Sequence, residues 1–174
     1  EEKALIFYPG AKVATEAYAP LMYQLAESGI DCFLVDMPFH MAFFGMNRAE
    51  EIMQEYNYEA WYLGGHSLGG AMAANFAADY VEDHTDGIRG LLLLAAYPTK
   101  DLSTSDMSVV TVYGSEDGVL NMDKIVAGRE LMPQDYKEVC IEGGNHAQFG
   151  SYGAQKGDGT AAIPAEEQWA RTVE

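Results

Sequence analysis

Basic residues are scarce in this sequence. Ten lysines and arginines stand against 27 aspartates and glutamates, which gives a formal net charge of −17 at pH 7. Nucleic acids and anionic membrane surfaces attract basic patches, so the charge balance argues against both as partners. It does not identify a substrate, because the local charge of a pocket matters more than the total.

Long apolar runs are also missing. The longest core-like run covers residues 90–96, whereas a membrane-spanning helix needs roughly 20 residues. The sequence begins at Glu1. It is therefore compatible with a cytoplasmic domain and equally with an extracellular or membrane-anchored domain that has lost a leader. We assign no localisation.

Cysteine is sparse as well. The two cysteines, Cys32 and Cys140, lie in apolar runs far apart in the sequence. Neither belongs to a C-x-x-C motif or to a metal-binding spacing, so we expect neither a redox site nor a metal site there. We interpret both as small buried hydrophobic residues.

Two kinds of element alternate along the chain. The length of 174 residues predicts a single domain over residues 1–174 with one core. The hydrophobic content of 48% is that of a globular protein. Short apolar runs typical of buried strands alternate with segments whose apolar residues recur at helical spacing. This pattern predicts an α/β fold, a three-layer α/β/α sandwich with a mostly parallel six-stranded sheet. The predicted strands cover residues 4–8, 32–36, 61–65, 88–96, 109–113 and 137–141.

The most informative motif lies at residues 64–70. This segment reads GGHSLGG and contains the pattern G-x-S-x-G, with Ser67 as its serine. It joins a predicted strand directly to a predicted helix, which is the context of a nucleophile elbow. Such a turn strains the backbone of the serine, and Gly65 and Gly69 leave room for it. We predict that Ser67 is a nucleophile; the alternative is a glycine-rich turn that only packs closely.

A nucleophilic serine needs a base to take up its proton, and the sequence offers four histidines. His146 follows the last predicted strand and Ser67 the third, so both fall at the carboxyl edge of the sheet, where such folds bind ligands. His66 adjoins the serine but points elsewhere on a sharp turn. His84 lies at the far end of the next helix. We predict His146 as the base and His40 as a pocket residue.

The base in turn needs a carboxylate that orients its imidazole ring. Asp117 lies in the turn YGSEDG, residues 113–118, which follows the fifth predicted strand. Its neighbour Glu116 is the rival. Gly118 favours a turn that presents Asp117 inward. With Asp117 the chain order becomes serine, aspartate, histidine; a solvated acidic turn is the alternative.

Two backbone N–H groups are expected to hold the negative charge that forms on a substrate oxygen. The first belongs to Leu68, at the start of the helix after the serine. The second should come from the loop YPGAKV, residues 8–13, where Gly10 lets the backbone turn inward. We predict Ala11 as this donor, with Lys12 as the alternative.

Together these motifs resemble those of the α/β-hydrolase superfamily. The segments GHSLGG, GSEDG and GGNH occur in that family's chain order, and the resemblance spans essentially the whole chain. The segments YPGAKV and GNHAQFGSYG, with a later GDG, are similar to a small bacterial branch related to dienelactone-hydrolase-like proteins. The resemblance implies a catalytic triad of Ser67, Asp117 and His146 and an oxyanion hole made by Ala11 and Leu68. The sequence departs from the superfamily pattern in two ways: the first two strands of the full fold are absent, and residues 97–106, after the fourth predicted strand, are too short for a lid.

Two segments without periodicity, residues 37–46 and 145–163, are expected to shape the substrate pocket. In the first, an apolar wall is expected from Met41, Phe43, Phe44 and Met46, with His40 as a further pocket residue; the alternative is a surface loop packed on the core. In the second, Asp158 lies in a glycine-rich loop, which raises the hypothesis of a calcium site; against it, the loop offers one carboxylate, whereas calcium takes roughly six to eight oxygen ligands.

The predicted function is a lidless serine hydrolase that cleaves a carboxylic ester or thioester of a small molecule through an acyl-enzyme. Such chemistry requires no metal ion, no organic cofactor and no partner protein. A catalytically inactive binding protein of the same fold, and an acyltransferase that uses the same three residues, are the alternatives. The oligomeric state is not predicted.

Overall fold

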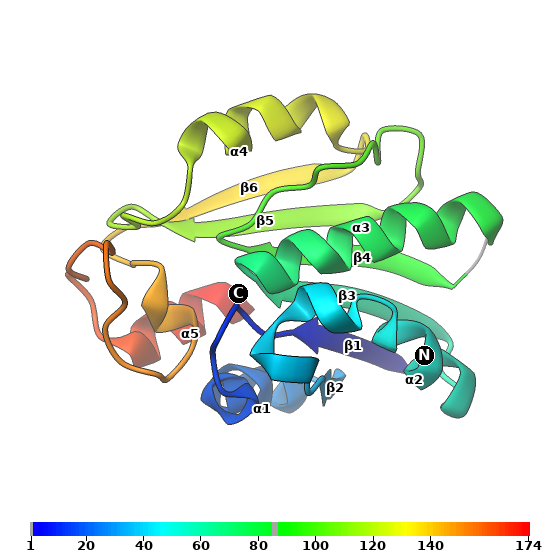
Figure 1. Cartoon of the computed structure of the whole chain (residues 1–174), viewed down its shortest axis with the longest axis horizontal. Helices are drawn as coiled ribbons and strands as arrows, with labels where there is room; N and C mark the ends of the chain where they lie inside the picture. The colour runs from blue at the N-terminus through cyan, green and yellow to red at the C-terminus, as the bar shows by residue number, and fades with distance from the viewer. Residues whose placement is uncertain (1, 85–86) are drawn as a thin grey trace.

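Strands and helices alternate along the chain in the computed structural model, which describes residues 2–84 and 87–174 (Figure 1). The strands are β1 (Lys3–Tyr8), β2 (Asp31–Leu34), β3 (Ala60–His66), β4 (Ile88–Leu94), β5 (Ser108–Gly114) and β6 (Tyr136–Ile141). The α-helices are α1 (Ala19–Glu27), α2 (Arg48–Glu55), α3 (Leu68–Asp83), α4 (Met122–Gly128) and α5 (Ala165–Val173). Within the described ranges, no helix combines the length and apolar character needed to cross a membrane.

The strands form one six-stranded sheet in the order β2-β1-β3-β4-β5-β6. Every neighbouring pair in that order is parallel. The predicted six-stranded parallel sheet is thus confirmed. Because all strands run the same way, their carboxyl ends lie along one edge, and the loops that follow β1, β3, β5 and β6 meet there.

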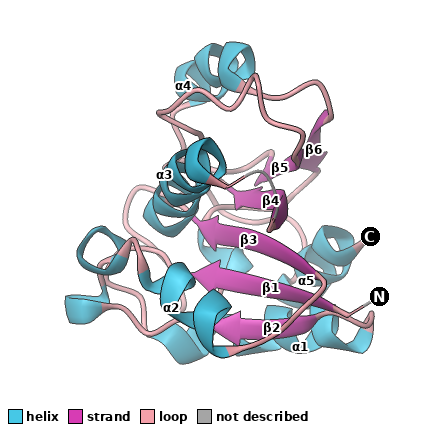
Figure 2. Ribbon diagram, turned by 90° about the vertical axis from the view of Figure 1, so that its right-hand side faces the viewer, coloured by secondary structure: helices cyan, strands magenta, loops and turns pink. Residues whose placement is uncertain are grey.

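Helices cover both faces of the sheet, as the alternation of side chains on β1 shows. Ala4 and Ile6 belong to one hydrophobic core with residues of α2 and α3, whereas Leu5 and Phe7 belong to a second core with residues of α1 and α5. Successive side chains of a strand point to opposite faces, so a strand that is apolar throughout must be covered on both. Figure 2 shows α1 and α5 on one side of the sheet and α2 and α3 on the other. The three-layer α/β/α sandwich is confirmed.

The two cysteines lie on the two outermost strands, Cys32 on β2 and Cys140 on β6, and both are free thiols. The expectation that both are buried is wrong: Cys32 is half-buried and Cys140 is exposed. Cys140 shares a face of β6 with Tyr136 and Glu138, since side chains alternate along the strand. An edge strand has a neighbour on one side only, so an apolar sequence there does not guarantee burial.

Candidate active site

Ser67 occupies the sharp turn between β3 and α3. Its backbone has φ 55° and ψ −122°, in the left-handed region that a residue with a side chain rarely adopts. The Ser67 N–H donates to the carbonyl of Leu94 at 2.9 Å. A Cβ atom at Gly69 would lie 2.2 Å from the Tyr8 carbonyl oxygen, and one at Gly65 would lie 2.4 Å from the Gly69 backbone. The two glycines of the motif are therefore needed for close backbone approach, as the sequence predicts.

His146 and Asp117 form a buried pair. The Nδ1 atom of His146 lies 2.8 Å from Oδ2 of Asp117, and the two side chains are only 2% and 3% exposed. The other oxygen, Oδ1, accepts the N–H groups of Val119 and Leu120, each at 2.8 Å. Burial raises the pKa of Asp117, but the hydrogen bonds from His146, Leu120 and Val119 outweigh it, so the pKa lies below its ordinary value. The rival Glu116 is exposed.

Ser67 and His146 line one pocket at the carboxyl edge of the sheet, with a volume of about 260 Å³. Asp117 approaches the histidine from the β5 loop, so the fold brings these three residues together from three separate strand ends. The rest of the lining is mostly small or apolar: Leu68, Ala71, Ala95, Ala96, Tyr97, Val119, Leu120 and Asn121.

The loop after β1 carries the predicted second oxyanion donor. The Gly10 N–H donates to the Tyr18 hydroxyl at 3.0 Å, and the Lys12 N–H donates to the His40 carbonyl at 2.7 Å. Over the described parts of the chain, no hydrogen bond uses the N–H of Ala11. Of these three amides, that of Ala11 makes no hydrogen bond within the described residues, although Ala11 is not among the residues that line the pocket of Ser67 and His146.

A comparison with family models decides the relationship. The model described as "Alpha/beta hydrolase family" matches residues 4–170. The chain belongs to the α/β-hydrolase family. No curated protein matches it in a sequence search.

Solved structures with the same fold include several other α/β-hydrolases. Est1E from Butyrivibrio proteoclasticus is similar with a TM-score of 0.73 and 15% identity, over 99% of this chain and 86% of that one. A monoacylglycerol lipase from Paleococcus ferrophilus matches with a TM-score of 0.73 and 15% identity, over 98% and 92%. The RedJ thioesterase from Streptomyces coelicolor matches with a TM-score of 0.67 and 12% identity, over 98% and 89%. At these identities the likeness concerns the fold.

A second histidine of this α/β-hydrolase, His66, lies beneath the site and has no predicted role. It is 1% exposed, and its ring centroid lies 4.6 Å from that of His146. Its Nδ1 atom is 2.7 Å from the Tyr18 hydroxyl, which already accepts the Gly10 N–H. The Tyr18 hydroxyl therefore links the backbone of Gly10 to the ring of His66. Burial, with a smaller contribution from His146, lowers the pKa of His66 to about 3.

This shift predicts acid sensitivity of the fold. The unfolded chain binds a proton at His66 below a pKa of about 6.5, whereas the folded chain does so only near 3. Between these values stability falls as the pH falls, by up to about 1.4 kcal/mol per pH unit. Urea unfolding at several pH values should therefore show a smaller loss on acidification for His66→Gln than for the wild type. Parallel losses in the two proteins would contradict this.

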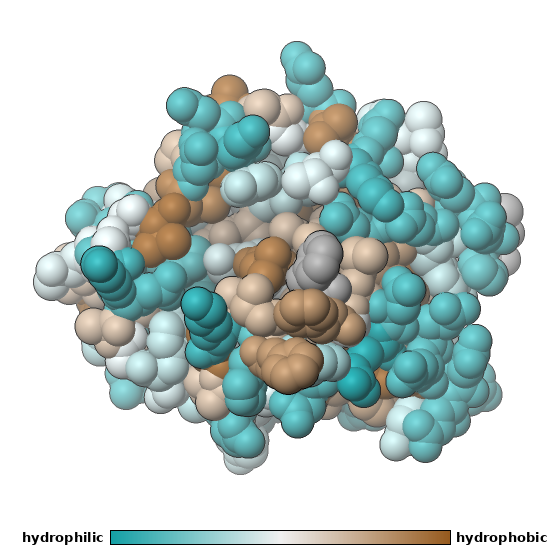
Figure 3. All heavy atoms as spheres, viewed as in Figure 1, coloured by the Kyte–Doolittle hydropathy of each residue, from teal (hydrophilic) through white to brown (hydrophobic). Residues whose placement is uncertain are grey.

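The predicted pocket residues His40 and Phe44 do not line the pocket that Ser67 and His146 share. Both are exposed, Phe44 at 58%, with its ring against that of Phe39. The side chain of Phe43 lies outside the described residues. Figure 3, viewed as Figure 1, shows apolar side chains gathered near the middle of the face toward the viewer, where the segment between β2 and α2 lies.

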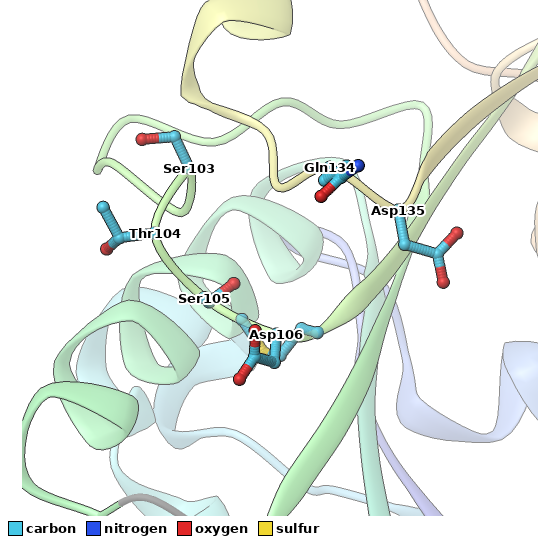
Figure 4. A pocket seen from close by; sticks show the side chains of 7 residues that line it. Ser103, Thr104, Ser105, Asp106, Gln134 and Asp135 are labelled. Carbon is cyan, nitrogen blue, oxygen red and sulfur yellow. The ribbon is translucent and has the colours of Figure 1, made fainter.

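A larger cavity of about 470 Å³ lies at the opposite edge of the sheet, where β5 and β6 begin (Figure 4). Its lining contains no histidine and consists of Ser103, Thr104, Ser105, Asp106, Met107, Gln134 and Asp135. The cavity therefore lacks the pair of a histidine and a carboxylate that lies beside Ser67.

The surroundings of Asp158 argue against the calcium hypothesis. The oxygens of Asp158 accept hydrogen bonds from backbone N–H groups, which present positive charge to them. In the described part of the chain, no group of three or more histidine, cysteine or acidic side chains could hold a metal ion.

Proposed function

We propose that this protein is a serine hydrolase that cleaves a small carboxylic ester or thioester through an acyl-enzyme intermediate. The observation that carries the proposal is the buried hydrogen bond between Asp117 and His146 in the wall of the pocket that also holds Ser67. A nucleophile, a base and a group that orients the base are the three parts that acyl transfer by serine requires.

In the proposed reaction, the Ser67 oxygen attacks the acyl carbonyl while Nε2 of His146 accepts the hydroxyl proton. Asp117 accepts a hydrogen bond from the Nδ1–H group of His146 and stays ionised, which keeps Nε2 free to act as a base and stabilises the charged ring. The N–H groups of Ala11 and Leu68 hold the oxyanion. His146 then gives its proton to the leaving group. In the second half of the reaction, water attacks the acyl group while His146 takes up a proton of that water, and His146 returns the proton to the Ser67 oxygen as the acid is released.

The shape of the pocket supports a small acyl group. Its volume is about 260 Å³, and its lining contains three alanines beside the serine. Residues 95–107, between β4 and β5, form a short connection with no added domain over the site. Among the similar structures are an Est1E complex described as containing ferulic acid, a lipase and a thioesterase, which supports an ester or thioester of a small molecule as the substrate.

A series of nitrophenyl esters and acyl thioesters of increasing chain length tests this proposal. We expect the wild-type protein to hydrolyse the shortest members best and kcat/KM to fall once the acyl chain exceeds the pocket. Added alcohol should not divert most of the product into a new ester; if it did, an acyltransferase would be the better description. A folded protein that turns over no member of either series would instead favour the inactive binding protein.

A further inference from the structure

One carboxylate links the loops that carry Asp117 and His146. Asp158 lies between β6 and α5, and its Oδ1 atom accepts the N–H of Gly118 at 3.1 Å and that of His146 at 3.2 Å. Its Oδ2 atom accepts the N–H of Ala147 at 2.9 Å. The Gly118 N–H belongs to the peptide bond that follows Asp117, and the His146 N–H to the base itself. A single carboxylate thus accepts hydrogen bonds from the backbone beside both Asp117 and His146.

The backbone around Asp158 is packed too tightly for side chains. A Cβ atom at Gly118 would lie 2.5 Å from the Gly157 carbonyl oxygen, and one at Gly159 would lie 1.9 Å from the Glu116 carbonyl oxygen. Glycines on both sides of this contact let the Asp158 loop lie directly on the Asp117 turn. The Gly159 N–H also donates to Oδ1 of Asp158 at 2.8 Å, which fixes the carboxylate in place.

We propose that Asp158 is a positioning residue that fixes the backbones of Asp117 and His146 relative to each other; this rests on the proposed function of that pair. Its carboxylate accepts from four N–H groups, and hydrogen bonds to an ionised acceptor are stronger than neutral ones. Asp158 touches no reacting atom in this role. It acts by holding the imidazole where Nε2 can reach the Ser67 oxygen.

The test uses Asp158→Ala and Asp158→Asn in the full chain. Alanine removes both acceptors, whereas asparagine keeps one oxygen and turns an NH₂ group toward a donor. We expect kcat for a short-chain nitrophenyl ester to fall by about 10²-fold in Asp158→Ala, as for a small displacement of a catalytic group, with KM nearly unchanged. Asp158→Asn should lose less. Asp101→Asn is the matched control, since Asp101 accepts the Ser103 N–H at 2.9 Å in an exposed turn elsewhere.

Two further readouts separate positioning from general damage. Amide hydrogen exchange should accelerate at Gly118, His146 and Ala147 in Asp158→Ala. The same substitution placed in Asp117→Asn should cost little further activity, because residues that act as a unit are not additive. An unchanged kcat in folded Asp158→Ala would overturn the proposal. So would a further 10²-fold loss of kcat in the double variant relative to Asp117→Asn alone. A wild type without esterase activity would refute the proposed function and this role with it, whereas unchanged amide exchange would refute the bridge alone.

Discussion

Ser67→Ala should lower kcat for ester hydrolysis by about 10⁶-fold, the loss typical of removing the nucleophile from such a triad. The fold should survive, because the side chain becomes smaller and the backbone N–H at position 67 keeps its hydrogen bond to the Leu94 carbonyl. Steady-state hydrolysis of a short-chain nitrophenyl ester measures the effect, and circular dichroism confirms folding.

Ser103→Ala is the control for this substitution. Ser103 lines the larger cavity at the far edge of the sheet, so its loss should leave turnover unchanged. Near-normal activity of Ser67→Ala, or a large loss in Ser103→Ala, would place the reaction somewhere other than the pocket beside His146.

Asp117→Asn should lower kcat by about 10⁴-fold while leaving the structure of the site intact. The amide oxygen can still accept the N–H groups of Val119 and Leu120, but its NH₂ group faces Nδ1 of His146. That nitrogen must then accept, so the proton moves to Nε2, which can no longer take a proton from Ser67. The loss should appear in kcat, because substrate binding uses other groups.

Glu116→Gln is the control for Asp117→Asn, since Glu116 is the neighbouring acidic residue and is exposed. We expect it to retain wild-type turnover. If Glu116→Gln lost activity and Asp117→Asn did not, the carboxylate that serves His146 would have been misassigned.

Features that depend on local sequence are predictable here. The strands at 61–65 and 109–113 lie inside β3 and β5, because an apolar run buried on both faces leaves a clear signal. The elbow at Ser67 is equally local: a strand, a glycine-flanked serine and a helix follow one another without a gap. The choice between Asp117 and Glu116 is less certain from sequence, because neighbouring residues in one turn differ only in the direction that the fold gives them.

Features that depend on distant packing are not predictable in the same way. The partners of His66 and Asp158 include residues far away in the sequence, so neither residue's surroundings can be inferred from its sequence neighbours. Cys140 has an apolar sequence context but lies on an edge strand that leaves its side chain exposed. The lining of the pocket near Leu120 depends on how the loops after β4 and β5 lie beside α3, which periodicity does not reveal.

Covalent labelling tests the role of Ser67 most directly. A fluorophosphonate reacts with an activated serine and leaves a stable phosphonyl group, which peptide mass spectrometry can place on one residue. We expect a single adduct on Ser67 in the wild type, none in Ser67→Ala, and slower labelling in Asp117→Asn. Equal labelling of wild type and Ser67→Ala, or an adduct on another residue, would contradict the assignment of Ser67 as the nucleophile.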